Sequence, residues 1–243
     1  MLEKPSYLFV GAGRLARHLC AYFDLLEISY RCWSRQDQIS FARATKDCNT
    51  IVLCIPDDAI EAFIRQEAPA LSHKPTWVHC SGNLSTPLAE SAHPLMTFGQ
   101  NLMTLEEYQS IPFITETGRA ELKTIFPELH NPAYEVKAEL KNFYHAWCVL
   151  AGNFSTMLWQ SFFDTCENRF DIPRRAAFPY LEKVAQQLQH DANPLSGPLA
   201  RGDKNTIKEH LDCLEGEPFK DVYAAFVKTF TALESKEASH AKH

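Results

Sequence analysis

Two histidines and a lysine have the side-chain chemistry that a proton donor or acceptor needs near neutral pH. Lys141 and His145 lie four residues apart in a stretch with helical spacing, so they share one side of the predicted helix. His93 precedes Pro94, which predicts extended backbone, and an imidazole titrates in the physiological range. We therefore predict a catalytic acid or base among His93, Lys141 and His145.

Each of these residues also has a structural interpretation. Lys141 can be a solvated lysine in the first helical turn, His145 a histidine bonded to a neighbouring loop, and His93 a histidine bonded to backbone groups. Tyr144 is a further candidate proton donor, and Gly152 leaves room for a substrate on the side of the helix that carries Lys141 and His145.

The stretch 7–16 predicts the scaffold that positions these side chains. Four apolar residues lead into Gly11, Gly13 follows, and a helical pattern begins at Arg14. A strand, a glycine turn and a helix with G-x-G-x-x-A spacing are typical of a dinucleotide-binding corner. Free main-chain N–H groups at the start of the helix favour a pyrophosphate. The predicted contacts are Gly11, Ala12, Gly13, Arg14 and Leu15. The alternative is a glycine turn in another kind of α/β protein.

The end of the second predicted strand, 28–33, indicates which cofactor binds. A residue that recognises the adenosine ribose belongs about 20 residues after the glycines. Ser34 and Arg35 stand there, and a hydroxyl and a guanidinium suit the 2′-phosphate of NADP. We therefore favour NADP over NAD. The alternative is that Arg35 is solvated and that Asp37 binds the ribose.

Unbroken apolar runs predict two more buried parallel strands, 50–56 and 75–80. Ligands of open α/β sheets bind outside the carboxyl ends of the strands, so the loops that follow should line the cofactor site. The predicted lining residues are Pro56, Asp57, Ser81 and Gly82. We interpret the pair Asp57 and Asp58 as the cap of a helix over 59–67 rather than as catalytic carboxylates.

The pattern changes from alternating strands and helices to helices alone at about residue 139. We predict an α/β fold, with a doubly wound parallel Rossmann sheet over residues 1–137 and an all-helical substrate and dimerisation domain over 138–243. Its first helix, 138–168, is long and apolar. Arg201 and Asp203 lie in a later loop, either as a helix cap with its ion pair or as part of a site. The remaining predicted elements are strands 111–115 and 133–136 and helices 119–129, 173–190, 203–215 and 218–235.

The composition of the chain limits the classes of partner and of site that we expect. The 243 residues carry a net charge of -6, which argues against nucleic acid or an anionic membrane as partner. The eight cysteines form no C-x-x-C pair, and we interpret them as reduced, buried thiols of a cytoplasmic protein. We expect no secretion signal, no membrane span and no metal site, since no zinc-ligand spacing occurs. The sequence contains neither the G-x-S-x-G pattern of serine hydrolases nor the phosphate-loop pattern of NTPases.

Several segments together resemble a known family, the Rossmann-like proteins whose C-terminal half is domain of unknown function 2520. The segments that carry the resemblance are GAGRLARHL (11–19), CIPDDAI (54–60), HCSG (79–82), HPLMTF (93–98), YHA (144–146) and GPLARGD (197–203). The stretch between Leu84 and His93 is shorter here than in that family.

The resemblance implies a fold like that of ketopantoate reductase, pyrroline-5-carboxylate reductase and the NADP-dependent deazaflavin oxidoreductases. It implies a C-terminal domain like that of 6-phosphogluconate dehydrogenase, a homodimer through this helical domain, and a cleft between the two halves. Residues that it carries over are cofactor-loop positions only, namely Gly11, Gly13, Arg14, Leu15, Pro56 and Asp57.

We therefore predict an NADP-dependent oxidoreductase that transfers a hydride between nicotinamide and a small carbonyl, imine or hydroxyl substrate. Two alternatives stay open. One is a non-enzymatic NADP-binding regulator or sensor, and the other is a Rossmann scaffold that acts as a dimeric interaction module.

Overall fold

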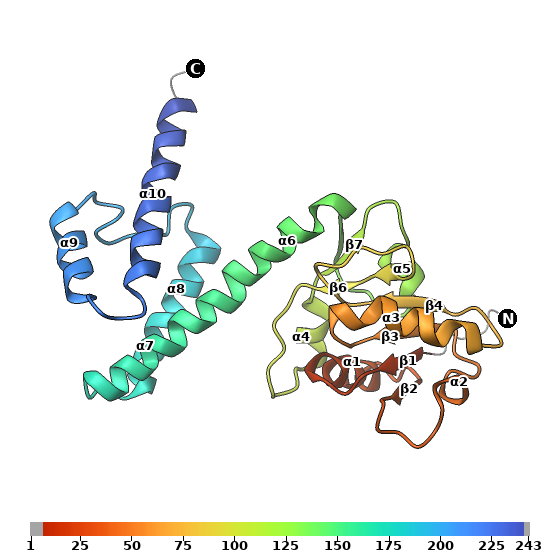
Figure 1. Cartoon of the computed structure of the whole chain (residues 1–243). Helices are drawn as coiled ribbons and strands as arrows, with labels where there is room; N and C mark the ends of the chain where they lie inside the picture. The colour runs from red at the N-terminus through yellow and green to blue at the C-terminus, as the bar shows by residue number, and fades with distance from the viewer. Residues whose placement is uncertain (1–6, 241–243) are drawn as a thin grey trace. The chain divides into compact units, whose positions relative to one another are not determined.

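The computed structural model describes the backbone of residues 7–240 and the side chains of residues 7–236. The chain divides into two compact units, Met1–Gln160 and Ser161–His243. Strands and helices alternate in the first unit, whereas the second is helical throughout its described part (Figure 1). The predicted domain boundary at 137/138 is not tested by this division and stays a prediction.

A five-stranded parallel sheet forms the centre of the first unit. Its strands lie in the order β2-β1-β3-β4-β5 and are joined by helices α1 (Arg14–Leu25), α2 (Phe41–Ala44) and α3 (Asp57–Glu67), with the short η1 (Ala68–Ala70) after α3. This order places β1 between β2 and β3, so the chain reverses its direction of travel across the sheet at β1 and β3. The strands are β1 (Tyr7–Val10), β2 (Tyr30–Trp33), β3 (Thr50–Leu53), β4 (Thr76–His79) and β5 (Glu90–Ser91).

Alternating residues of β1 show that both faces of this sheet are covered. Tyr7 and Phe9 belong to a buried cluster with Tyr22 and Phe23 of α1. Leu8 and Val10 belong to the cluster on the other face, which includes residues of α2 and α3. Side chains of a strand point alternately to its two faces, so this division is the doubly wound arrangement. The predicted α/β fold is confirmed.

A smaller three-stranded sheet completes the first unit. Strand β6 (His93–Pro94) pairs antiparallel with β7 (Phe113–Glu116), and β7 pairs parallel with β8 (Ala133–Val136). Helix α4 (Leu105–Ser110) precedes β7 and begins with a capping box between Thr104 and Glu107.

The helix predicted over 119–129 is much shorter than expected, because α5 covers only Leu122–Ile125. The carboxylate of Glu90 accepts hydrogen bonds from the guanidinium of Arg119 at 3.0 and 3.1 Å and from the backbone N–H of Ala120 at 3.1 Å. These bonds hold the first residues of the predicted helix outside helical geometry. Pro127 follows α5 closely and cannot continue a helix.

The long helical stretch predicted over 138–168 is present as four consecutive segments. They are η2 (Ala138–Leu140), α6 (Lys141–Cys148), the π-helical η3 (Val149–Phe154) and α7 (Ser155–Arg169). Large apolar side chains recur along it at alternating spacings of four and three residues, and they are between 45% and 66% exposed. We call this set the exposed stripe, and its members are Phe143, Trp147, Leu150, Phe154 and Met157.

The second unit continues from α7 with four further helical segments. They are η4 (Arg174–Ala177), α8 (Phe178–His190), α9 (Lys204–Cys213) and α10 (Lys220–His240). Asp203 caps α9, since its carboxylate accepts a hydrogen bond from the backbone N–H of Thr206 at 3.1 Å. In the described part of this unit, no ion pair joins Arg201 to Asp203. The capping half of the structural interpretation is therefore confirmed.

The cysteines are less uniformly buried than expected. All eight are thiols, but Cys32 and Cys213 are exposed, and Cys48, Cys80 and Cys166 are the buried ones among them. The sulfur atoms of Cys32 on β2 and Cys20 on α1 lie 3.3 Å apart. Across residues 7–240, no helix is long and apolar enough to cross a membrane.

Candidate active site

The corner between β1 and α1 has the backbone geometry that the glycine spacing predicts. Gly11 has φ +117°, and a Cβ there would lie 2.5 Å from the backbone oxygen of Cys54 at the end of β3. Gly13 is the N-cap residue of α1, and no atom lies within 4 Å of where its Cβ would be. Ala16 is buried against the sheet. Gly11 is thus required by the protein's own packing, whereas Gly13 leaves open space beside the free N–H groups of a helix start.

This open space fits the pyrophosphate of a dinucleotide, which folds of this kind bind at the corner between the first strand and the first helix. A dinucleotide pyrophosphate needs main-chain N–H donors, the positive end of a helix, and freedom from side chains at closest approach. The first turn of α1 supplies the donors, and the missing Cβ of Gly13 supplies the freedom. Ala12 and Arg14 are exposed beside it and Leu15 is half-buried.

The end of β2 brings together both candidates for ribose recognition. The carboxylate of Asp37 accepts hydrogen bonds from the backbone N–H of Ser34 at 2.5 Å and from its hydroxyl at 3.1 Å. Arg35, which lies between Ser34 and Asp37 in the sequence, is exposed. A carboxylate at this position suits ribose hydroxyls and a guanidinium suits a 2′-phosphate, so both interpretations of this loop keep their chemical basis.

A hydrogen bond ties the carboxyl end of β3 to that of β4. The hydroxyl of Ser81 donates to the carboxylate of Asp57 at 2.5 Å and accepts from the backbone N–H groups of Asn83 and Leu84. One donor and two acceptor sites are all that a hydroxyl has, so the Ser81 hydroxyl is fully used within the protein. Asp57 is the first residue of α3 rather than part of its cap, which is Pro56.

Gly82 is the point at which the two predicted catalytic histidines meet. A Cβ on Gly82 would lie 2.7 Å from Cδ2 of His145 and 3.0 Å from Nε2 of His93. The two imidazoles lie edge to face, with ring centroids 5.9 Å apart. Nδ1 of His93 is 2.9 Å from the hydroxyl of Tyr144. His93 is therefore bonded to a side chain and not, as the structural interpretation had it, to backbone groups.

Burial and neighbouring charge keep His93 neutral. Burial lowers its pKa from 6.5 to about 4, with smaller contributions from His145 and Lys141. A neutral imidazole has one N–H donor and one acceptor nitrogen. His93 can therefore donate a hydrogen bond in one direction and accept one in the other at neutral pH.

Lys141 is buried, which excludes the solvated first-turn lysine. Its ammonium donates to the hydroxyl of Ser91 at 2.7 Å and lies 3.7 Å from the carboxylate of Glu116. The side chains of Lys141 and Glu116 are 5% and 8% exposed. Burial lowers the pKa of Lys141, and the Glu116 carboxylate opposes this effect. The hydrogen bond to Ser91 joins the start of α6 to β5 and the ion pair with Glu116 joins it to β7, so that together they fix the helix that carries Tyr144 and His145.

Sequence reasoning missed His79, the last residue of β4. It is fully buried, its Nδ1 accepts a hydrogen bond from the backbone N–H of Ser81 at 3.2 Å, and its Nε2 has no partner in the described part of the chain. Burial, followed by the charges of Lys141 and Arg119, lowers its pKa to about 3. A neutral His79 thus holds the loop that carries Gly82. Only its place in an apolar strand run before Ser81 hinted at this role.

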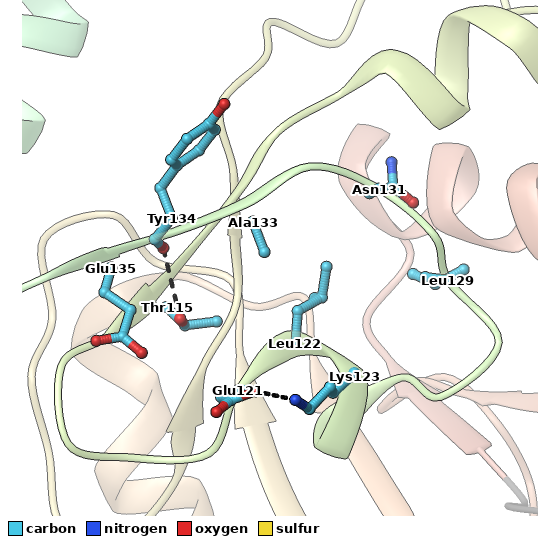
Figure 2. Close-up of a pocket in the computed structure, with 9 residues that line it drawn as sticks. All are labelled: Thr115, Glu121, Leu122, Lys123, Leu129, Asn131, Ala133, Tyr134 and Glu135. Carbon is cyan, nitrogen blue, oxygen red and sulfur yellow. Dashed lines mark hydrogen bonds and ion pairs between the residues drawn. The ribbon is translucent and has the colours of Figure 1, made fainter.

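A cavity lies elsewhere in the first unit, away from these residues. It has a volume of about 210 Å³ and lies beside β7, β8 and α5, and none of the predicted site residues lines it. Figure 2 shows the residues that line it. Its lining residues are Thr115, Glu121, Leu122, Lys123, Leu129, Asn131, Ala133, Tyr134 and Glu135. No group of three or more potential metal-binding side chains occurs among the described residues.

Comparisons with known proteins support the fold and the family. Residues 111–230 match the family described as Domain of unknown function (DUF2520). No curated protein matches the chain. A solved Bacteroides fragilis protein, provisionally named an NADP oxidoreductase, has 19% identity and a TM-score of 0.77 over 95% of this chain and 99% of its own.

Two further solved structures agree. A Thermotoga maritima protein has 21% identity and a TM-score of 0.67 over 96% of this chain and 99% of its own. The pyrroline carboxylate reductase of Plasmodium falciparum, solved with NADP bound, has 13% identity and a TM-score of 0.57 over 93% of this chain and 96% of its own. Together with the family match, these likenesses show that the chain is a Rossmann-like protein with a C-terminal DUF2520 domain.

Proposed function

We propose that the protein is an NADP-dependent oxidoreductase that transfers a hydride between nicotinamide and a small carbonyl, imine or hydroxyl compound. The observation that carries the proposal is the meeting of His93 and His145 at Gly82, beside the carboxyl end of β4. Nucleotides bind at the carboxyl ends of such sheets. Two imidazoles at that edge can supply the acid–base chemistry that accompanies hydride transfer.

The cofactor would be held by the corner between β1 and α1. Its pyrophosphate would receive N–H groups between Gly11 and Leu15, and its 2′-phosphate would meet Arg35. Ile55 and Pro56 at the end of β3 would lie beside it, next to the Asp57–Ser81 bond. When bound, NADP supplies or accepts the hydride.

The protein's own contribution would be to bind the substrate and to handle its proton. His145 is half-buried and would exchange a proton with the substrate heteroatom, while His93 would hold that atom by a hydrogen bond. A catalytic role of Lys141 stays a prediction. Its ammonium already has two partners, and the structure supports a contribution through the position of α6.

A titration with NADPH and NADH tests cofactor binding. Tight binding at a hundredfold excess over Kd stabilises a protein by about 2.7 kcal/mol, which thermal shift and nucleotide fluorescence both detect. Arg35→Ala should weaken NADPH much more than NADH, with Arg43→Ala on α2 as a control that removes an arginine away from this loop. Equal weakening of both nucleotides would instead favour ribose binding by Asp37. If neither nucleotide raised the melting temperature, the remaining hypothesis would be a Rossmann scaffold that acts as an interaction module.

A substrate screen separates an enzyme from a sensor. Wild type and His145→Ala are compared on a panel of aldehydes, ketones, cyclic imines and alcohols, with NADPH or NADP⁺ consumption as readout. We expect turnover that His145→Ala lowers by about 100-fold while NADPH binding is kept. Binding without turnover on any compound would support the regulator.

We propose that the protein is a homodimer through the exposed stripe of the long helical segment. Its apolar residues follow the four-three spacing by which one helix packs along another, and soluble proteins rarely leave such a stripe open. Light scattering after gel filtration should give a dimer for wild type. Phe143→Ser with Trp147→Ser should give a monomer, whereas Lys137→Ser, which lies outside the stripe, should not.

A further inference from the structure

The two ring nitrogens of His93 face different surroundings. Nδ1 lies 2.9 Å from the hydroxyl of Tyr144 on α6. Nε2 points toward Gly82, where a Cβ would lie only 3.0 Å away. Among the described residues, the bond at Nδ1 is the one hydrogen bond found for the His93 ring. Whichever nitrogen carries the proton therefore decides whether His93 offers a donor or an acceptor beside Gly82.

Tyr144 settles the position of that proton. Its hydroxyl has one hydrogen and lies between two partners, Nδ1 of His93 and the thiol of Cys148 one helical turn further along α6. An imidazole nitrogen is a good acceptor, whereas a thiol sulfur is a weak one. The tyrosine hydrogen is therefore directed to Nδ1, and the thiol hydrogen of Cys148 can be donated to the tyrosine oxygen. Nδ1 then accepts, and the ring proton lies on Nε2.

Both groups keep these protonation states near neutral pH. Burial, together with the bond to Cys148, raises the pKa of Tyr144, so its hydroxyl stays protonated. The groups that face His93 from α6 are Tyr144, His145 and Lys141, and the last two, with burial, keep the imidazole neutral. The arrangement resembles the use of a neutral imidazole as a hydrogen-bond donor in catalysis.

We propose that Tyr144 is a positioning residue that fixes His93 as the Nε2–H tautomer, and that the site consequently takes a carbonyl compound rather than an iminium ion. The substrate class rests on the proposed oxidoreductase function, whereas the tautomer does not. A neutral N–H donor beside Gly82 binds an atom with a free lone pair, such as the oxygen of an aldehyde or ketone or the corresponding alcohol. A protonated imine is itself an N–H donor and has no lone pair to accept the bond.

The tautomer can be measured without a substrate. Long-range proton–nitrogen correlation spectra of protein labelled with ¹⁵N-histidine distinguish Nε2–H, Nδ1–H and doubly protonated rings, and His93→Gln assigns the signal. We expect the Nε2–H pattern in wild type, retained down to about pH 5. Tyr144→Phe should give a mixture of tautomers, and the control Cys148→Ala should keep the wild-type pattern. An Nδ1–H ring in wild type, or an unchanged pattern in Tyr144→Phe, would overturn the role of Tyr144.

The substrate class is tested by turnover with NADPH on matched panels of ketones, aldehydes and cyclic imines. We expect turnover of carbonyl compounds, with kcat about tenfold lower in Tyr144→Phe and KM nearly unchanged, since the donor is misdirected rather than removed. Turnover confined to imines, or absent from the whole carbonyl panel, would overturn the substrate class. Failure of the proposed function itself is recognised separately, because NADPH would then produce no thermal shift while the tautomer of His93 stayed fixed.

Discussion

Replacement of Gly13 by alanine is expected to abolish NADPH binding and leave the fold intact. The backbone of Gly13 has φ -76°, which any residue can adopt, and no atom lies within 4 Å of the new Cβ. The added methyl group therefore meets nothing in the protein. It enters the open space beside the first turn of α1, where we propose that the pyrophosphate approaches the backbone most closely.

The structure bounds the size of both effects. Alanine is a poorer N-cap than glycine, but it restricts the unfolded chain, and the two terms of about 0.5–1 kcal/mol oppose each other. The melting temperature of unliganded Gly13→Ala should thus stay within about 4 °C of wild type. NADPH at a hundredfold excess over the wild-type Kd should raise the wild-type melting temperature by about 5–10 °C. In Gly13→Ala most of that rise should be lost.

Gly11→Ala is the matched control, because the same change at this neighbouring glycine has a different physical cost. Its Cβ would lie 2.5 Å from a backbone oxygen at the end of β3, and its φ of +117° disfavours any side chain. We expect it to lower stability before any nucleotide is added. Thermal shift with and without NADPH separates the two variants. A Gly13→Ala protein that keeps the full NADPH shift would refute the proposed position of the pyrophosphate.

Three further predictions concern residues outside the cofactor corner. Acid should destabilise the fold through His79, whose pKa is about 3 in the folded protein and 6.5 ordinarily. As the pH falls from 6.5 to about 3, the unfolded chain binds a proton that the folded chain does not, so the free energy of unfolding decreases. Urea denaturation at neutral pH and at about pH 4.5 measures this fall in the free energy of unfolding. The difference between the two pH values should be smaller in His79→Asn than in wild type. A mild thiol oxidant should form a disulfide between Cys20 and Cys32, whose sulfur atoms are 3.3 Å apart. Peptide mapping of the oxidised protein that finds no Cys20–Cys32 disulfide would contradict this prediction. Lys141→Met should lower the free energy of unfolding by about 3–5 kcal/mol, because it leaves Glu116 buried without a counter-charge. The double variant with Glu116→Gln should recover most of that loss.

Local spacing was sufficient to predict the corner between β1 and α1. The positive φ of Gly11, the open space at Gly13 and the small size of Ala16 are requirements of one turn and one helix, and each falls on a single residue, although the backbone of Cys54 after β3 also excludes a side chain at Gly11. The doubly wound sheet follows for the same reason, because buried parallel strands read as unbroken apolar runs wherever they occur in the chain. The sequence therefore predicts those parts of the fold whose causes lie close together along the chain.

The helix predicted over 119–129 fails for the opposite reason. Its residues have adequate helical propensity, but Arg119 and Ala120 are held by the carboxylate of Glu90 on another strand. Two charge-assisted contacts to the guanidinium and one to a backbone N–H outweigh the few tenths of a kcal/mol by which propensity favours a helix at each position. Nothing within the segment itself signals that partner.

The pair His93 and His145 depends both on residue types that are visible in the local sequence and on contacts with residues distant in the chain. His93 and His145 stand out by residue type, yet each has an ordinary local explanation, and neither explanation mentions the other residue. Their meeting depends on Gly82, where any side chain would occupy the space that the two imidazoles share. It depends equally on Lys141, whose buried ammonium ties α6 to Ser91 and Glu116 and so fixes the helix that carries His145. A glycine with ordinary loop spacing and a lysine in a first helical turn are thus the conditions for the site. Their importance becomes visible only when the contacts across three separate elements are known.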